Sequence, residues 1–206
     1  MFTTLSTKGE KHRYLAFKSH FNYNLTMPLT FLTGNANKAA QLSQYLELPV
    51  DHHKLDLHEI QSLDNAQIAE HKTHQAYHIL HTPVLTDDVS LVIHSLGRLP
   101  GPFVKFFIDE IGNQGICNLI TSDHRSATAS VTIGYYDGHD FHTFVGTING
   151  TISSEPRGDG GFGWDAILIP TGYTQTRAEM NQTDYDATSP RKAALLQLRE
   201  LLSAQS

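Results

Sequence analysis

The amino-acid sequence predicts a mixed α/β fold with two lobes, and two patterns carry that prediction. Apolar strand candidates alternate with amphipathic helices in the first half of the chain, whereas residues 127–152 alternate apolar and polar side chains as antiparallel strands do. The chain has 206 residues, of which 39% are hydrophobic and 17% charged, which suits one domain or two lobes on a shared core. A cleft between lobes is the natural place for a binding site.

The first half of the chain predicts alternating strands and helices. Residues 29–33 form an apolar strand candidate, residues 34–37 a turn, and residues 38–48 a helix whose apolar positions recur at helical spacing. A second helix is expected over residues 65–81, and a strand over residues 84–86 follows it. The opening of the domain is therefore predicted to be a strand-turn-helix unit.

The second half adds a helix and a strand pair. A polar turn is expected at Asp87 and Asp88, directly after the preceding strand. A third helix is predicted over residues 103–111. The two strands within residues 127–152 are separated by the sequence Asp-Gly-His-Asp at 137–140, which indicates a hairpin turn.

The chain is expected to end in a helix over residues 190–202. Ser189 is a favourable N-cap and Pro190 suits the first helical position, ahead of a stripe of alanine and leucine. Residues 28–206 are assigned to one domain. Residues 1–27 carry four lysine or arginine residues against one glutamate, which fits either a targeting leader or a poorly ordered extension, and we exclude them from the fold prediction.

Charge and cysteine content restrict the class of protein. A formal net charge of -6 argues against a general nucleic-acid or membrane-surface binder, because both usually present a broad basic face. No run approaches the ~20 apolar residues that cross a bilayer. The single cysteine, Cys117, has no partner for a disulfide, so we expect a reducing, cytoplasmic environment.

A glycine-rich segment, DGGFGWD at residues 159–165, is the strongest candidate for a ligand site. Glycines on both sides of Phe162 let a ligand approach the main chain closely, while the phenylalanine offers a face for stacking. Asp165 could then contact the edge of a flat ring. The alternative is an ordinary turn in which Phe162 and Trp164 belong to the core.

Two further segments suit a phosphate and a divalent cation. Residues 33–38, TGNANK, lie where a strand precedes a helix, so backbone N–H groups and Lys38 can meet an anion, although a capped helix start explains them as well. Asp88, with a distant acid such as Glu59, would suffice for Mg²⁺, which commonly takes one or two carboxylates. A solvated acidic turn is the alternative for Asp87 and Asp88.

Two basic features have less specific meanings. Lys105 falls in the first turn of the third predicted helix and points either to solvent or toward an anion. Four histidines share one face of the second predicted helix, which suits either a zinc site or a polar, partly solvated face: His71, His74, His78 and His81.

Taken in order, these segments resemble the inosine triphosphate pyrophosphatase family, which hydrolyses noncanonical purine nucleoside triphosphates. The resemblance covers roughly residues 29–202 and depends on the motifs FLTGNANK, LDLHEI, TDDVSLVIHSLGRLPGPFVKFF, EPRGDGGFGWDAI, GYTQTRAEM and SPRKAALLQL. It implies a mixed α/β fold with a long central sheet, two lobes around a nucleotide cleft, Mg²⁺ as cofactor and commonly a homodimer. No nucleic-acid or membrane partner is expected.

The resemblance also assigns roles to residues of this sequence. Glu59 and Asp88 would bind Mg²⁺, and Phe162 would stack on the purine. Arg191 would reach the keto group of hypoxanthine or xanthine. The catalytic set is then Lys38, Lys72 and Asp88, and the substrate-binding set is Thr33, Gly34, Asn35, Lys38, Val89, Lys105, Phe162, Gly163, Trp164, Asp165, Tyr185 and Arg191.

Three residues depart from the family pattern. Val89 stands where a hydroxyl residue is usual, Tyr185 where a lysine is usual, and Pro190 where a histidine is usual. Fewer hydrogen-bonding groups in the site should relax the discrimination between bases. The competing hypothesis is a nucleotide-binding protein of the same fold with weak or no turnover.

Overall fold

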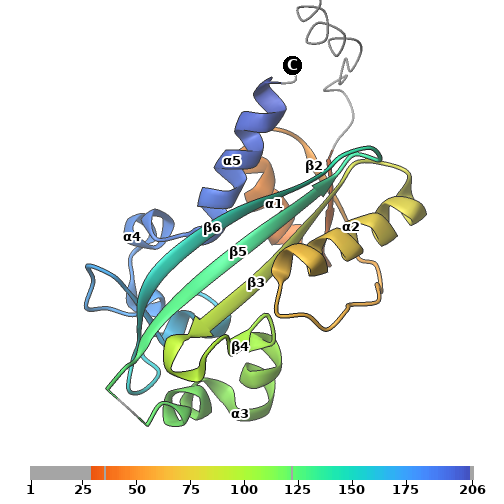
Figure 1. Cartoon of the computed structure of the whole chain (residues 1–206). Helices are drawn as coiled ribbons and strands as arrows, with labels where there is room; N and C mark the ends of the chain where they lie inside the picture. The colour runs from red at the N-terminus through yellow and green to blue at the C-terminus, as the bar shows by residue number, and fades with distance from the viewer. Residues whose placement is uncertain (1–28, 35, 122, 205–206) are drawn as a thin grey trace, which may run out of the picture.

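The computed structural model describes residues 29–34, 36–121 and 123–204, so the predicted extension 1–27 lies outside the described residues. Seven strands form one mixed sheet in the order β2-β1-β3-β5-β6-β7, and β4 pairs with β3 outside this order. Figure 1 shows the long strands β3, β5 and β6 crossing the molecule diagonally. The predicted mixed α/β class with a long central sheet is confirmed.

Parallel and antiparallel pairings divide the sheet. β1 pairs in parallel with β2 and β3, and the remaining pairs are antiparallel. The strands are β1 (Leu29–Leu32), β2 (Val50–His53), β3 (Val84–Ile93), β4 (Pro100–Gly101), β5 (Ser126–Tyr136), β6 (Phe141–Ile152) and β7 (Leu168–Pro170). The predicted hairpin within residues 127–152 is confirmed, because β5 and β6 pair along their whole length.

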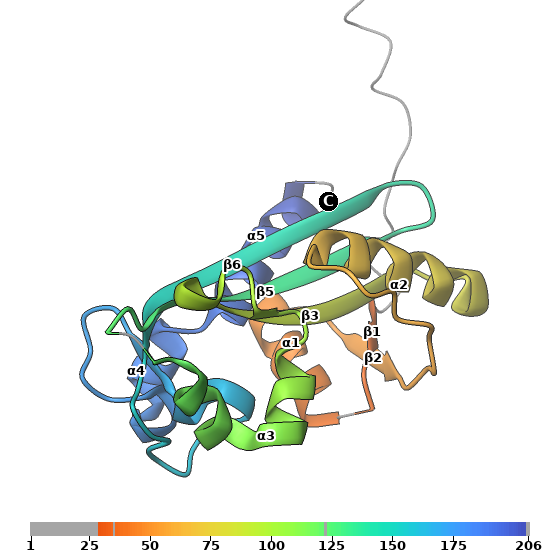
Figure 2. The same ribbon diagram turned by 60° about the horizontal axis from the view of Figure 1, so that its bottom comes forward.

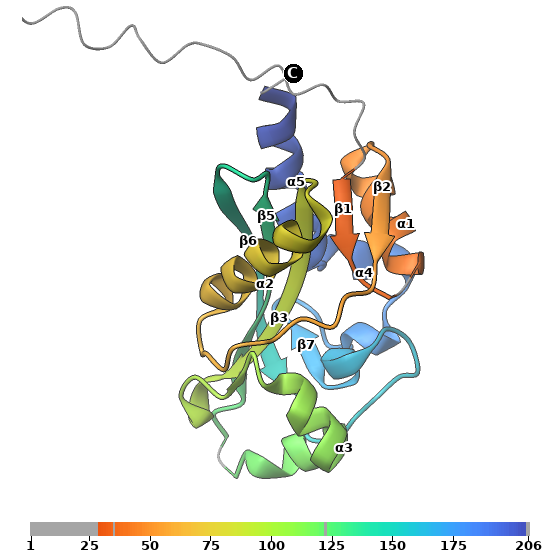
Figure 3. The same cartoon turned by 90° about the vertical axis from the view of Figure 1, so that its right-hand side faces the viewer.

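Helices cover both faces of the sheet. They are α1 (Ala36–Leu46), α2 (Asn65–Leu80), α3 (Val104–Leu119), α4 (Gln182–Ala187) and α5 (Pro190–Ala204). A Cβ on Gly134 would meet Ala69 and Thr73 of α2, whereas one on Gly146 would meet the backbone of α5. Gly146 pairs with Val131, which points to the opposite face from Gly134, so α2 and α5 lie on opposite faces (Figure 3).

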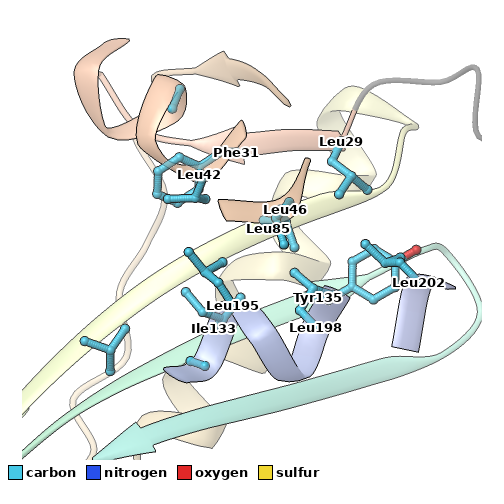
Figure 4. Packing of buried hydrophobic residues seen from close by; sticks show 13 residues of the cluster. Leu29, Phe31, Leu42, Leu46, Leu85, Ile133, Tyr135, Leu195, Leu198 and Leu202 are labelled. Carbon is cyan, nitrogen blue, oxygen red and sulfur yellow. The ribbon is translucent and has the colours of Figure 1, made fainter. Parts of the chain in front are cut away.

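Two apolar clusters form the core. The first joins β1, β3 and β5 to α1 and α5, and Figure 4 shows Leu195 and Leu198 of α5 against Ile133 and Tyr135 of β5. The second joins the far ends of β3 and β5 to α3 and to the segment around Trp164. Val89 packs against both clusters. The two predicted lobes correspond to these clusters.

The predicted polar turn at Asp87 and Asp88 is wrong. Both residues lie in the middle of β3, which continues to Ile93 and pairs with β5 throughout. On its other side β3 meets β1 only at Val84 and Leu85, and meets β4 only at Leu91 and Val92. The sheet therefore leaves an edge of β3 open between these pairs, and the two aspartates lie in that opening.

The third helix is longer than predicted. It extends from Val104 to Leu119, and Gly112 interrupts it with φ 66° and ψ 175°, values that are not helical. The predicted end at residue 111 thus marks the interruption, and a second helical segment follows. Figures 1 and 2 place α3 beyond the carboxyl end of β3, whereas α5 begins beside β6 and ends at the other end of the molecule.

Candidate functional site

A cavity of about 680 Å³ opens on the face of β3 that carries Val89. Its walls come from α1, β3, the segment 162–165 and the start of α5, so it lies where the two apolar clusters meet. Of the predicted site residues, the cavity brings together Lys38, Val89, Phe162, Trp164, Asp165, Tyr185 and Arg191. Its other lining residues are Ala40, Gln41, Gln44, Val131, Arg177, Ser189 and Pro190.

Phe162 lies close to two cations in this cavity. The residue is 50% exposed. The Lys38 Nζ lies 5.6 Å and the Arg191 Cζ 5.4 Å from the ring centroid. The aromatic face and the two positive charges suit a flat ring that carries an anionic group.

Arg191 is held in place by Asp87. Its Nε donates to the Asp87 Oδ2 over 2.5 Å, and both side chains are almost fully buried. The Arg191 Nη2 is buried and has no hydrogen-bond partner among the described residues. A buried donor without an acceptor is costly, so a ligand that supplies an acceptor here would be favoured.

Asp165 organises the loop that carries Phe162. Its carboxylate accepts hydrogen bonds from the Phe162 backbone N–H at 3.0 Å, the Tyr185 hydroxyl at 2.8 Å and the Arg177 Nε at 2.8 Å. Arg177 also donates to the backbone and hydroxyl of Thr188. Because protein donors already occupy both oxygens, Asp165 shapes the pocket wall more than it contacts a base edge.

The uncharged side chain of Tyr185 lines the same pocket. Burial, followed by the charge of Asp165 and the hydrogen bond to it, raises the pKa of Tyr185 to about 12. The Arg177 guanidinium lies 4.1 Å from the Tyr185 ring centroid. The phenol is thus protonated at physiological pH, and its proton is directed to Asp165.

A second cluster lies on the opposite face of β3. The Lys72 Nζ of α2 contacts the Asp88 Oδ1 at 2.7 Å and the Glu59 Oε1 at 2.8 Å. Because side chains alternate along a strand, Asp88 points toward α2 while Asp87 and Val89 point toward the cavity. The structure therefore brings Glu59, Lys72 and Asp88 together, next to the open edge of β3.

This cluster fits a divalent cation. The Asp88 Oδ2 is buried and has no hydrogen-bond partner among the described residues. Burial raises the pKa of Asp88, against the opposing effect of Lys72, and Asp87 and Glu59 raise it further. Burial of the Lys72 ammonium lowers its pKa, but Asp88 and Glu59 outweigh this and leave the pKa raised. An excess of carboxylate over ammonium, with one oxygen unpaired, suits a hard cation such as Mg²⁺.

The remaining predicted residues lie outside both groups. Thr33 follows β1 and donates its backbone N–H to His53, and Gly34 lies in an exposed bend before α1. Asn35 lies outside the described residues. Lys105 is 76% exposed and pairs with Asp109 on α3, so it does not line the cavity. Gly163 follows Phe162 with φ 61°, and its carbonyl accepts a hydrogen bond from α3.

The predicted histidine face is divided among different contacts. His71 bonds to Gln75, and the His74 ring packs on Tyr136 and Phe141. His81 caps α2 in the left-handed conformation. No group of three or more histidine, cysteine, aspartate or glutamate side chains in the described part of the chain could hold a metal ion.

Two residues that contact predicted site residues are missing from the sequence-based set, namely Asp87 beside Arg191 and Arg177 beside Asp165. The sequence places Asp87 in an acidic turn and Arg177 only within a motif. The alternation of side chains along a strand would have separated Asp87 from Asp88, had the strand been extended past residue 86. The contact of Arg177 with Asp165 spans twelve positions that include the strand β7, so no spacing rule of a single helix or strand indicates it.

Comparisons with known proteins agree on one family. A model of the Ham1 family matches residues 29–201. The chain is 40% identical to inosine triphosphate pyrophosphatase 2 of Trypanosoma cruzi over 176 residues, which cover 83% of this chain and 90% of that protein. It is 34% identical to the dITP/XTP pyrophosphatase of Saccharolobus solfataricus over 177 residues, which cover 84% of this chain and 92% of that protein.

Solved structures share the fold. The Staphylococcus aureus Ham1 protein superposes with a TM-score of 0.75 at 21% sequence identity, covering 87% of this chain and all of that one. A HAM1 protein from Coxiella burnetii superposes with a TM-score of 0.74 at 26% sequence identity, covering 86% of this chain and 99% of that one.

Among the described residues, no helix is long and apolar enough to cross a membrane.

Proposed function

Because the chain belongs to the Ham1 family, we propose that it hydrolyses noncanonical purine nucleoside triphosphates such as ITP, dITP and XTP to the monophosphate and pyrophosphate. One observation of the structure supports this activity above all. An aromatic and cationic cavity on one face of β3 adjoins a cluster of one lysine and two carboxylates on the other face. The open edge of β3 between them would let one ligand reach both.

Residues on the cavity side would hold the base. Phe162 would stack on the purine, and the Arg191 Nη2 would donate to the keto oxygen of hypoxanthine or xanthine. Adenine carries an amino group at that position, which offers no acceptor to Arg191. Asp87 would fix the guanidinium so that this donor is aimed before the ligand arrives.

Residues on the α2 side would serve the phosphates. Glu59 and Asp88 would hold Mg²⁺, which neutralises phosphate charge and polarises the phosphoryl oxygens when bound. Lys38 and Lys72 would add positive charge, and Asp88 would orient or deprotonate the water that attacks the α-phosphorus. Lys105 would take part only if its side chain leaves Asp109.

The family resemblance also supports a proposal on assembly, and the cysteine content supports one on location. We expect a homodimer in solution, which light scattering after size-exclusion chromatography would measure. The single cysteine leads us to expect a reducing, cytoplasmic environment, and microscopy of the tagged protein would test that placement.

Product analysis tests the activity directly. The protein is incubated with Mg²⁺ and, separately, ITP, dITP, XTP, ATP or GTP, and the products are separated by anion exchange. Monophosphate plus pyrophosphate, formed faster from the keto purines ITP, dITP and XTP than from ATP, supports the proposal. Release of orthophosphate would indicate cleavage of a different bond, and binding without product would favour the alternative of a nucleotide-binding protein.

A further inference from the structure

Besides apolar packing around Trp164, one side chain of α3 makes a hydrogen bond to the backbone of the loop that carries Phe162. The Asn113 Nδ2 donates to the Gly163 carbonyl over 2.8 Å, fifty positions away in the chain. The other atom of the amide, Oδ1, is buried and has no hydrogen-bond partner among the described residues. The Gly163 carbonyl oxygen can only accept a hydrogen bond, so the NH2 group of the Asn113 amide must face it. This one hydrogen bond therefore orients the amide.

The interruption of α3 is what places Asn113 there. Gly112 adopts φ 66° and ψ 175°, a conformation that is restricted almost entirely to glycine. One turn later, Gly115 packs so closely on Ile111 that a Cβ would lie 2.6 Å from the Ile111 Cβ. The two halves of the helix thus meet at a fixed bend, with Asn113 as the first residue after it.

Other contacts also hold the loop that carries Phe162, since the Gly160 N–H donates to the Ala178 carbonyl over 3.1 Å. Gly161 and Gly163, on either side of Phe162, have φ values of 69° and 61°, which glycine adopts readily. Neither residue has a side chain that could fix the backbone next to Phe162. Asp165 anchors the loop from the side of α4 through the Phe162 N–H. Asn113 anchors it from the side of α3, through the carbonyl of the peptide group that joins Gly163 to Trp164.

We infer that Asn113 is a positioning residue for purine binding, which acts by fixing the Gly163 peptide and therefore the placement of the Phe162 ring. The inference depends on the proposed function for the role of Phe162 as the stacking surface. Asn113 lies outside the cavity, on α3, which belongs to the core cluster around Trp164. The inference adds it to the residues that determine the affinity for the base. Asn113 does not contact the proposed substrate.

The only tryptophan of the chain lies in this loop and provides a readout that needs no activity. Trp164 directly follows Gly163 and is 6% exposed, so acrylamide quenches its fluorescence poorly while the loop is held. Replacement by a residue of similar size without a donor, Asn113→Leu, should raise the quenching constant. Asn118→Leu is the matched control, because Asn118 lies on the same half of α3, is exposed and bonds only to Gln114 among the contacts described.

The second readout is a double-mutant cycle on the KM for ITP. One lost hydrogen bond corresponds to a KM rise of about 2- to 10-fold for Asn113→Leu, with kcat little changed. If Asn113 acts through the ring, the same substitution should leave the KM of a Phe162→Ala protein unchanged, because coupled residues are not additive. An equal rise of KM in both backgrounds, or unchanged quenching of Trp164, would overturn the inference.

The two readouts separate this inference from the proposed function. If the wild-type protein hydrolyses no nucleotide, the proposed function fails, while the quenching of Trp164 still tests whether Asn113 holds the loop. If Asn113→Leu does not fold, Asn113→Asp replaces it, because a carboxylate also cannot donate to the Gly163 carbonyl. In that variant too, unchanged quenching contradicts the inference.

Discussion

Lys72 is the residue at which the proposed metal ligands meet. Its ammonium contacts both Asp88 and Glu59 and compensates part of their charge. One oxygen of Asp88 has no hydrogen-bond partner among the described residues. Arrival of Mg²⁺ and a triphosphate would supply the cation to the carboxylates and an anion to Lys72, so each group would exchange one partner for a stronger one.

Removing the charge of Asp88 should abolish most of the activity. We expect Asp88→Asn to lower kcat by at least ~100-fold, because one ligand of the cation and the proposed base are lost together. The amide is the same size, so circular dichroism and the midpoint of thermal unfolding should change little. Asp51→Asn, on the exposed edge strand β2, is the control and should retain full activity. A kcat near the wild-type value would remove Asp88 from the mechanism.

Tyr185 predicts a stability difference at high pH. Its pKa rises from 10.0 to about 12 on folding, so the folded protein holds the phenol proton more tightly than the unfolded chain. This contribution to stability is complete below about pH 10 and is lost as the pH rises through 12. The difference in urea midpoint between the wild type and Tyr185→Phe should therefore shrink over that window.

Other groups that titrate in the same range cancel in this comparison, because both proteins contain them. A midpoint difference that stays constant from pH 9 to 12, or that grows, would show that the phenol is not held by Asp165 in solution.

At the scale of elements, the packing of α5 on β6 sets the position of Arg191. A Cβ on Gly146 would lie 1.9 Å from the carbonyl oxygen of Pro190, at the start of α5. Backbone cannot yield as a flexible side chain can, so the whole start of the helix would have to move. Arg191 is the next residue and would move with it.

Gly146→Ala should therefore affect both stability and substrate binding. We expect a loss of about 1–3 kcal/mol in the free energy of unfolding, typical of overpacking, and a higher KM for ITP. Urea denaturation and steady-state kinetics measure the two effects. Thr147→Ala, one residue along on an exposed position of the same strand, should change neither. A Gly146→Ala protein with wild-type stability would show that the gap between β6 and α5 is wider than described.

Elements with strong local signals could be predicted from the sequence. The turn chemistry at Ser189 and Pro190 and the apolar spacing of α2 gave helices whose observed bounds differ from the predicted ones by one or two residues. The strand β3 could not be predicted past residue 86, because two adjacent acids are rare in strands. Their side chains are tolerated only because Lys72 and Arg191 compensate them from opposite faces.

The candidate site was predictable in composition and not in arrangement. Phe162 and Asp88 are indicated by their local sequence, a glycine-framed aromatic and an acid after a strand, whereas Arg191 is indicated only by the resemblance to a known family. The pair formed by Arg191 and Asp87 joins residues 104 positions apart, and only the folded sheet and helix bring them together. Lys105 illustrates the reverse case, since a matching motif does not show that its side chain points away from the cavity.

At the scale of the whole molecule, the proposed site joins two core clusters that share little besides Val89. A ligand that reaches from Phe162 to Asp88 would contact parts of both, so it should stabilise the folded protein as a unit. The analogue of ITP with a methylene group between the α- and β-phosphates suits this measurement, because it cannot be cleaved at the proposed bond. At a concentration of 100 times its Kd, it should add about 2.7 kcal/mol to the free energy of unfolding.

Removal of Mg²⁺ should weaken that stabilisation, because Asp88 and Glu59 would then repel the phosphates. Thermal unfolding with the analogue, with and without a chelator, measures both effects in one series. The Phe162→Ala protein should show a smaller shift at the same analogue concentration, because one of the two contact regions is lost. If the shift in the chelated sample equals that with Mg²⁺, the cluster of Glu59, Lys72 and Asp88 does not contact the ligand, and the assignment of the phosphates to the α2 face of β3 is wrong.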